Sequence, residues 1–310
     1  MSDLTVSPTG TGNPRARRRR ADDVAGLGRA RASLFVAPSL LLIGLFLLFP
    51  AIWTIVLGTT DYRLTGLSAA NTSFVGLNNY ARAFTDPSFW NSLQLTVVFV
   101  FLSGIVGQTL LGFSLAWSLR RLTGWTRTLI ESLALAAWVI PGSVHAFLWI
   151  ALLDRRNGTL NAMLDMPGKA WLIDHPMAVI VIFNIWVGTA FSMQLFSSAL
   201  SAVPPSQLES ARLAGAGEFR QLIDVVLPTI KGHILTNTLM ITLWTFNTFT
   251  PYLLTAGGPN RKTEIISVYI YKTAIGGGQL GFGAAISMIM LIINLAIALV
   301  YMRVGRGGRK

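Results

Sequence analysis

The polar side chains inside the long apolar stretches of this sequence are almost all neutral. An amide can both donate and accept hydrogen bonds with hydroxyl groups, and an aromatic face can cover the apolar C–H face of a ring. This combination suits non-covalent recognition of a neutral polyol such as a sugar, although Asn and Trp also serve as contacts between membrane helices and as interfacial belts. The residues concerned are Trp138, Asn184, Trp186, Gly188, Phe191, Gln194, Trp244, Asn247, Thr248, Phe249 and Tyr252.

Several kinds of covalent chemistry are excluded or disfavoured by what the sequence lacks. It has no cysteine, which excludes thiolate chemistry and disulfides. No phosphate-binding loop of the G-x-x-x-x-G-K-[ST] type occurs, because Gly168-Lys169 is followed by Ala170. No Ser/His/Asp or His/Glu constellation suggests an intramembrane enzyme.

His145 is the only ionisable residue deep in an apolar stretch, and we interpret it as an interior histidine with its hydrogen bonds satisfied. A proton-driven carrier would need more such groups.

The composition places the chain in a membrane. Of 310 residues, 52% are hydrophobic and 12% charged, with a mean hydropathy of +0.56. Six apolar stretches are long enough to cross a bilayer, and Pro141 and Pro251 should kink two of them. The predicted fold is therefore an all-α membrane protein with spans at about 33–57, 92–119, 128–152, 177–203, 234–254 and 282–302.

The distribution of basic residues predicts the orientation. Residues 1–32 are rich in Arg and are expected to be a disordered tail, followed by a retained span and not by a cleaved signal peptide. This tail, the 120–127 loop, the 204–232 segment and the C-terminal end at 304–310 with its neighbour Arg303 hold 17 of the 25 Lys and Arg residues. The positive-inside rule places both termini and the 204–232 segment in the cytoplasm. The net charge of +12 thus reflects topology and contact with membrane lipid, and we expect no nucleic-acid partner.

The polar segment 204–232 lies between the fourth and fifth apolar stretches and is expected to fold into two short helices. Ser206 and Glu209 have the spacing of a capping box, which predicts a helix from about Gln207. Glycines at 215 and 217 should break it, a second amphipathic run should follow from Glu218, and Pro228 should end that run.

The same segment resembles the EAA loop of ABC-importer permeases. The run that carries the resemblance is Glu209-Ser210-Ala211, Gly215-Ala216 and Val225-x-Leu227-Pro228, and it keeps the Glu, the second Ala, the Gly and the Leu-Pro of the pattern at the right spacing. The sequence departs from the usual pattern with Ser210 for an Ala, Val225 for an Ile, and Ala214 where many members carry Asp. The resemblance implies a type I ABC-importer transmembrane domain over about 33–303, with this loop as a coupling helix docked on a separate ATPase.

Other stretches resemble the carbohydrate-uptake branch of that family, the maltose- and glycerophosphate-type permeases. They are Phe74–Tyr80 after the first span, Gly158-x-x-Asn161, and Gly257-Gly258-Pro259. The resemblance implies that the N-x-W-x-G-x-x-[YF] run before the coupling loop lines the sugar site. On this ground the expected substrate contacts are Trp138, Asn184, Trp186, Gly188, Phe191, Trp244, Asn247 and Phe249.

The resemblance also implies the partners: a second homologous permease, two ATPase subunits that bind ATP and Mg²⁺, and an extracytoplasmic solute-binding protein. The chain itself would hold no cofactor or metal, would not be an enzyme, and would lie in the bacterial inner membrane. A neutral mono- or disaccharide is favoured because the spans contain no central Lys or Arg. Glycerophosphate, another polyol-like solute, and an autonomous secondary carrier remain as alternatives.

Overall fold

The computed structural model describes residues 29–307 of the chain. The chain divides into two units, residues 1–54 and residues 55–310. The described part of the first unit contains α2 (Arg29–Ile43), the π-helical segment η1 (Gly44–Leu48) and the start of α3 (Phe49–Gly58). Within these helices the stretch Ser33–Gly58 is 26 residues long and strongly apolar, as a bilayer span requires. Most of the predicted basic tail, residues 1–28, lies outside the described residues, as do residues 308–310.

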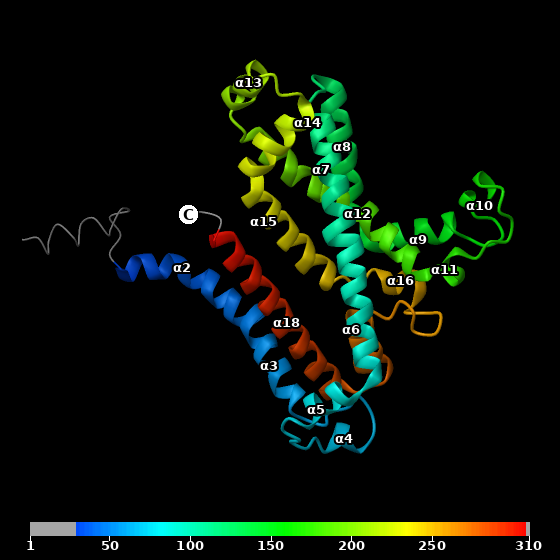
Figure 1. Cartoon of the computed structure of the whole chain (residues 1–310). Helices are drawn as coiled ribbons and strands as arrows, with labels where there is room; N and C mark the ends of the chain where they lie inside the picture. Colours follow the sequence, from blue (N-terminus) through cyan, green and yellow to red (C-terminus); the bar gives the residue numbers. More distant parts are fainter. Residues whose placement is uncertain (1–28, 308–310) are drawn as a thin grey trace, which may run out of the picture. The chain divides into compact units, whose positions relative to one another are not determined.

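The second unit is also helical, and its described residues contain no strand beyond an isolated bridge between Thr60 and Phe74. Its elements after α3 are α4 (Leu67–Ala70), α5 (Asn78–Thr85), α6 (Pro87–Phe99), η2 (Val100–Gln108), α7 (Thr109–Leu119), α8 (Trp125–Val139), α9 (Gly142–Leu152), α10 (Thr159–Met163), α11 (Trp171–Asp174), α12 (Pro176–Ser201), α13 (Pro205–Leu213), α14 (Glu218–Arg220), η3 (Gln221–Val226), α15 (Leu227–Phe246), α16 (Pro251–Thr255), α17 (Ile266–Tyr271), η4 (Lys272–Gly276) and α18 (Leu280–Gly307). Figure 1 places α13 at one end of this unit and α4 and α5 at the other.

Four of the six predicted stretches are single helices long and apolar enough to cross a membrane. They are Ser33–Gly58, Pro87–Leu119, Pro176–Ser201 and Leu280–Gly305. The second of these is continuous through α6, η2 and α7. Many of their large apolar side chains are exposed, which is what a lipid environment allows.

The third and fifth predicted stretches are interrupted near the two prolines that were expected to kink them, so the change of direction is a break of the helix and larger than a kink. Pro141 separates α8 from α9, and the two helices meet at 98°. Proline removes a backbone donor and forces the residue before it out of the helical conformation, and Ile140 is indeed extended with ψ 134°. The 234–254 stretch likewise ends as α15 at Phe246 and resumes as α16 at Pro251.

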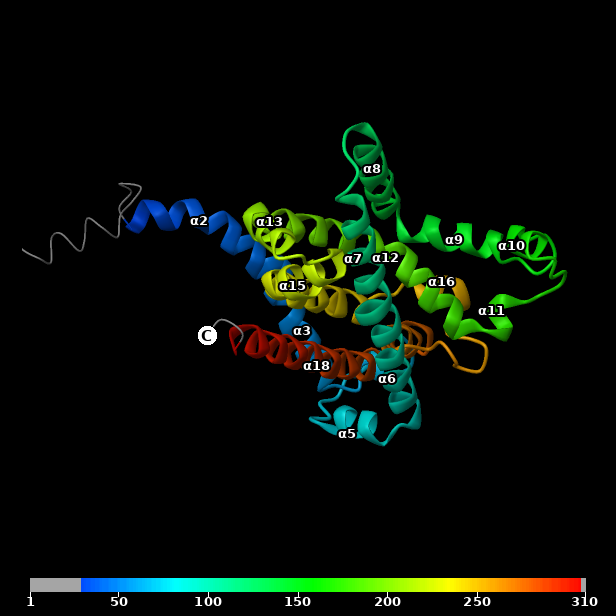
Figure 2. The same ribbon diagram turned by 45° about the horizontal axis from the view of Figure 1, so that its top comes forward.

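The helix pair formed by α7 and α12 is the centre of the packing (Figures 1 and 2). Gly112 permits this approach, because a Cβ atom there would lie 2.5 Å from the Ser192 side chain. Ala116 one turn later is buried as well, so the small residues at 112 and 116 allow α7 and α12 to pack closely. Helix α15 packs against α12 and η2, and α18 packs against α15.

Two of the loop motifs owe their form to a buried asparagine. The amide nitrogen of Asn79 donates to the backbone oxygens of Gly58 and Thr60, at 3.0 and 2.7 Å, and so ties α5 to the end of α3. The amide of Asn161 donates to three backbone oxygens, and its Oδ1 accepts from the Trp171 indole at 2.6 Å. Both asparagines hold loops that would otherwise be free to move.

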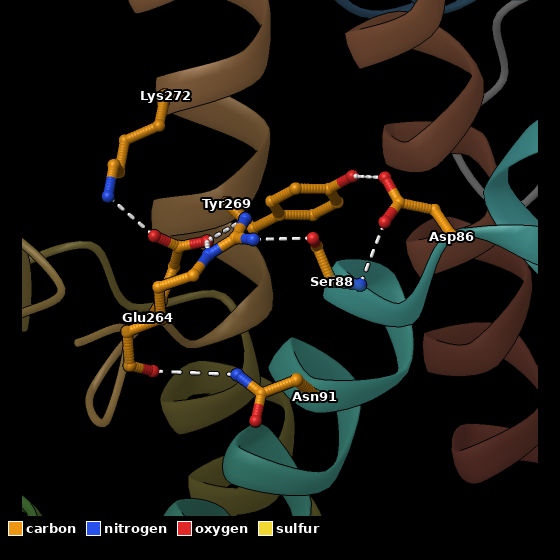
Figure 3. A network of polar contacts seen from close by, with 7 residues as sticks. Asp86, Ser88, Asn91, Glu264, Tyr269 and Lys272 are labelled. Carbon is orange, nitrogen blue, oxygen red and sulfur yellow. Dashed lines mark hydrogen bonds and ion pairs between the residues drawn. The ribbon is translucent and has the colours of Figure 1, made fainter.

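The loop that contains the Gly-Gly-Pro motif is fastened by a buried carboxylate (Figure 3). Glu264 is fully buried, and its two oxygens face Arg261 at 2.7 Å and Lys272 at 2.5 Å. Arg261 also donates to Ser88 at the start of α6, and its backbone oxygen accepts from Asn91 at 3.5 Å. The network therefore joins this loop to α6 and to η4, which follows α17 directly.

A second carboxylate closes the same network from α6. Asp86 caps α6 by accepting from the backbone N–H of Ser88 at 2.8 Å, and it accepts from the Tyr269 hydroxyl at 2.6 Å. Burial by itself would raise the pKa of Asp86, but these hydrogen bonds and the positive charge of Arg261 hold that pKa below its usual value. The carboxylate is thus charged at neutral pH and holds α6 to α17.

Replacing Glu264 by Gln should lower the thermal unfolding temperature at neutral pH. Two cations would then face a neutral amide, and we expect a loss of about 2 kcal/mol, less than a fully buried pair because both cations reach water. Asp174→Asn is the matched control, since its ion pair with Lys169 reaches water on both sides and should contribute little to stability. Differential scanning fluorimetry of the purified chain measures both; equal shifts would contradict the structural role of Glu264.

Candidate functional site

Helix α13 ends in a turn that only a residue with left-handed backbone can complete without strain. Gly215 has φ +81°, and the N–H groups of Gly215 and Ala216 donate to the backbone oxygens of Arg212 and Ala211, both at 2.9 Å. This pair of bonds is a Schellman motif, which satisfies the carbonyls at a helix C-terminus. The glycine predicted to break the helix is therefore its C-terminal cap.

The start of α13 differs from the prediction. The helix begins at Pro205, two residues earlier than expected, with Pro204 as its N-cap and no side-chain cap hydrogen bond. Ser206 and Glu209 lie inside the helix, so no capping box forms. Proline at the first helical position is favourable because its missing N–H would have no helical partner there, and this preference sets the start.

The second half of the loop continues into a membrane helix. Helix α14 begins at Glu218 as predicted, but it runs through η3 into α15, and Pro228 lies in the first turn of α15 instead of ending a helix. The π-helical turns before Pro228 widen the backbone where the ring would clash with the preceding turn. Leu227 and Pro228 thus belong to the base of α15.

The 204–232 segment packs against a small apolar core. Val203, Val226 and Ile230 are buried there together with Ala116 and Leu119 of α7 and with Met193, Phe196 and Ala199 of α12. Gln221 is buried too, and its amide donates to the Ala216 oxygen at 2.8 Å. An exposed ion pair joins Arg121 to Glu218. The loop is therefore held against the ends of α7, α12 and α15.

The outer surface of the loop carries two large apolar side chains that the sequence reasoning did not single out. Leu213 is 91% exposed and Phe219 is 73% exposed, one on each side of the Gly215 turn. Glu209, Ser210 and Ala214 are exposed beside them, whereas Ala211 and Ala216 are half-buried. Apolar side chains that protrude from a polar loop indicate a protein partner.

Three of the predicted substrate residues form one aromatic cluster. The rings of Trp138 in α8 and Phe191 in α12 stack with centroids 5.4 Å apart, and Trp244 in α15 lies 6.1 Å from each. Trp244 is 63% exposed, so the cluster offers an open ring face. The geometry thus brings together residues from three separate helices.

The cluster lies beside both helix breaks. Trp138 is two residues before Ile140 and Trp244 three before Asn247, where α8 and α15 end. The breaks themselves are adjacent, since a Cβ atom at Gly142 would lie 3.2 Å from the Thr250 hydroxyl. Helix C-termini leave backbone carbonyls without helical partners, and these oxygens can accept hydrogen bonds from a ligand.

Two of the predicted residues lie instead in the contact between α12 and η2. Asn184 is buried, its amide donates to the Ser103 hydroxyl at 2.8 Å, and its backbone oxygen accepts from Gln108 at 3.0 Å. Gly188 makes room for the same glutamine. The structure thus places Asn184 and Gly188 in helix packing, away from the aromatic cluster.

Trp186 faces a different set of neighbours. Its ring packs edge-on against His145 at 5.0 Å and lies 6.0 Å from Trp149. His145 is 2% exposed, yet neither ring nitrogen has a hydrogen-bond partner among the described residues, so the expectation of a satisfied histidine is wrong. The break at Pro141 turns α9 away from α8 and leaves the ring among aromatic neighbours that cannot accept a hydrogen bond in its plane.

The last two predicted substrate residues, Asn247 and Phe249, contact side chains that the prediction did not include. Asn247 pairs its amide reciprocally with that of Asn294 in α18, at 3.3 Å in each direction. Phe249 lies 4.9 Å from Tyr252 and 5.0 Å from Tyr271, and these three rings form a second aromatic cluster. Tyr271 and Asn294 come from segments that carried no local motif, so only the fold could reveal them.

Comparison with known proteins places this arrangement in a family. Residues 108–310 match the family described as binding-protein-dependent transport system inner membrane component. The trehalose/maltose transport system permease protein MalF of Thermococcus litoralis is 32% identical over 75% of this chain and 80% of its own length. The sn-glycerol-3-phosphate transport system permease protein UgpA of Agrobacterium fabrum is 30% identical over 85% of this chain and 90% of its own.

The fold has solved counterparts too. A chain of the bacterial alginate ABC transporter, solved in complex with alginate pentasaccharide-bound periplasmic protein, superposes with a TM-score of 0.75. It is 18% identical, and the match covers 93% of this chain and 96% of that chain. At this identity the likeness concerns the fold alone.

A methyl group at Gly188 should destabilise the chain if the residue serves packing. The Cβ of Gly188→Ala would lie 2.0 Å from the Gln108 Oε1, so the glutamine must move and give up its bond to Asn184. We expect a loss of about 1 to 3 kcal/mol, measured as a lower thermal unfolding temperature. Gly232→Ala is the control, because its Cβ would meet nothing within 4 Å. Unchanged stability with altered solute affinity would instead favour a substrate contact.

Proposed function

This chain belongs to the family of binding-protein-dependent transport system inner membrane components, and we propose that it forms the pathway for a neutral sugar across the membrane. It is a permease subunit of a sugar-type ABC importer and is not itself an enzyme. The observation that carries the choice of a sugar is the cluster of Trp138, Phe191 and Trp244 beside two helix breaks.

Aromatic faces and free carbonyls together suit a sugar. The ring faces can cover the apolar C–H face of a pyranose, and the carbonyls at the ends of α8 and α15 can accept from its hydroxyls. Irregular backbone at membrane depth is stable only where protein or water supplies hydrogen-bond partners. Two adjacent breaks therefore favour a hydrated passage at the level of the cluster.

Glycerophosphate is the second candidate substrate, since one relative is named for glycerol-3-phosphate transport. An anionic solute would need Arg, Lys or a helix N-terminus near its phosphate. Helices α9 and α16 begin at the two breaks, but neither of them contains a Lys or Arg, and α12, which carries Phe191, has no charged residue along its whole length. With no Lys or Arg in these three helices to pair with a phosphate, we prefer the neutral sugar for this chain.

The partners follow from the family. The importer depends on a binding protein that delivers the solute. A second homologous permease and two ATPase subunits, which would bind ATP and Mg²⁺, complete the proposed assembly. The six-span topology with both termini in the cytoplasm is supported by the distribution of 17 of 25 basic residues, and requires that α8–α9 and α15–α16 each count as one broken span.

The coupling loop would transmit ATPase closure to the sugar site. Its exposed Leu213 and Phe219 would dock in the ATPase, and its apolar core is continuous with α12 and α15. Phe191 belongs to α12 and Trp244 to α15, so a displacement of the loop would change the distances between the rings of the cluster. ATP can drive this change only as far as the ATPase dimer binds the outward-facing state better.

Affinity purification of the tagged chain from its native membrane should recover an ATPase and a second permease.

Gly215→Val should reduce both ATPase recovery and uptake while leaving membrane insertion intact, because a β-branched residue at φ +81° costs about 1 to 2 kcal/mol and distorts the turn. Gly217→Val is the matched control, with φ −66° and nothing within 4 Å of a Cβ atom. A homo-oligomer that transports alone would overturn the assignment to an importer.

Trp244→Ala should weaken sugar uptake without reducing the amount of assembled importer. Loss of one stacking face is worth about 1 kcal/mol, or about a fivefold rise in the half-saturating concentration. Uptake of labelled maltose, trehalose and sn-glycerol 3-phosphate would be compared in cells that express each variant. Trp125→Ala is the control, since this residue is 75% exposed at the start of α8 and outside the cluster. Equal effects of both substitutions would argue against the cluster as the sugar site.

A further inference from the structure

Helices α7 and α8 both pack against α12 but contact each other little, and residues of all three helices line a groove between them. The groove contains two cavities, one of about 230 Å³ near the coupling loop and one of about 220 Å³ further along α12. They are one helical turn apart, since Ser197 lines the first and Met193 the second. Their linings differ in chemistry.

The cavity near the coupling loop is cationic. Its lining includes Trp117, Arg120, Arg127, Ser197, Ser201 and Leu208. The Arg120 guanidinium lies 3.3 Å above the Trp117 ring, and its buried Nε has no hydrogen-bond partner among the described residues. A buried donor of this kind costs free energy unless something accepts its hydrogen bond.

The charges around this cavity are not balanced. Arg127 is paired with Glu131 at 2.9 Å, and Arg121 is paired with Glu218. Arg120 has no carboxylate partner in the described part of the chain. Burial, and then the positive charges of Arg121 and Arg212, lower the pKa of Arg120, so an anion would relieve a real repulsion.

The second cavity is apolar. Its lining includes Leu111, Leu115, Ala137, Trp138, Trp186 and Met193. With hardly any polar group it offers nothing to the hydroxyls of a sugar, but it suits a hydrocarbon chain. The groove thus carries a cationic end and an apolar continuation, which is the polarity of an anionic lipid.

The position of the cationic end agrees with this polarity. Two apolar spans end there, α7 at Leu119 and α12 at Ser201, and α8 begins nearby at Trp125. Helix ends of this kind mark the membrane interface, where lipid headgroups lie. In the proposed topology it is the cytoplasmic leaflet, which is the anionic one.

We propose that the groove between α7, α8 and α12 binds one anionic phospholipid, with its phosphate at Arg120 and an acyl chain in the apolar cavity. Free phosphate would leave the apolar cavity without an occupant, and a zwitterionic lipid would bring a cation toward the arginines. Leu208 of α13 lines the cationic cavity, so the bound lipid would also hold the coupling helix to the groove. Trp138 belongs both to the lining of the apolar cavity and to the aromatic cluster of the proposed sugar site, so the two sites share this residue.

Native mass spectrometry of the full-length chain, purified in mild detergent with the subunits that accompany it, tests this site. The probes are phosphatidylglycerol, phosphatidylcholine of the same acyl chains, and inorganic phosphate. We expect phosphatidylglycerol to be retained better than phosphatidylcholine, and Arg120→Gln to reduce its retention about tenfold through the loss of a charge-assisted hydrogen bond. Arg303→Gln, an exposed arginine outside the cavity, should leave retention unchanged.

A second pair of variants tests the acyl chain. Ala137→Phe should fill the apolar cavity and reduce phosphatidylglycerol retention, whereas Val139→Phe, at a position 67% exposed on the same helix, should not. Equal retention of the two lipids, or full retention by Arg120→Gln, would overturn the proposal. Displacement of the lipid by millimolar phosphate, or no effect of Ala137→Phe, would overturn it in favour of a plain anion site. None of these readouts uses uptake, so they stand apart from the proposed transport function.

Discussion

In hydrocarbon a backbone N–H or C=O has no water to bond, so a membrane helix can stop only where the protein itself or a hydrated cavity provides partners. This constraint makes the breaks at Pro141 and at residues 247–250 the most informative features of the chain. They lie next to each other, and the cluster of Trp138, Phe191 and Trp244 lies beside them. A pair of isolated kinks could be accidental, but two adjacent breaks lined by aromatic faces define a place where a polar solute can be accommodated within the membrane.

Helix α12 connects that place to the proposed coupling loop at residues 204–232. Its middle carries Phe191 of the aromatic cluster, and its last turns carry Phe196 and Ala199 of the small core beneath α13. The helix is uninterrupted over 26 residues and packs closely on α7 through Gly112. A rigid element between the two regions is what coupling over a distance requires, because a displacement at one end is not absorbed on the way.

The region around the loop after α16 combines apolar packing with charge. Buried apolar side chains of α6, α17 and α18 belong there to the larger apolar core of the described residues. Glu264 pairs with Arg261 and Lys272, which holds the loop to η4, and Asp86 accepts from Tyr269, which holds the start of α6 to α17. Charge-assisted hydrogen bonds are directional, so they add a fixed geometry to the apolar packing.

Local rules in the sequence determined the class of fold, the four uninterrupted apolar helices, the start of α14 and the break at Gly215, because hydrophobic length and glycine conformation act over a few residues. These rules gave the wrong start for α13, because Pro205 at the first helical position replaced the expected capping box. They also gave the wrong role to Pro228, which lies in the first turn of α15 and does not end a helix. Only the tertiary structure decided that Asn184 and Gly188 pack against η2 while Trp138, Phe191 and Trp244 meet. Those contacts join residues between 53 and 106 positions apart in the sequence. Which face of α12 contacts which neighbour is set by the packing of several helices together and not by any one stretch.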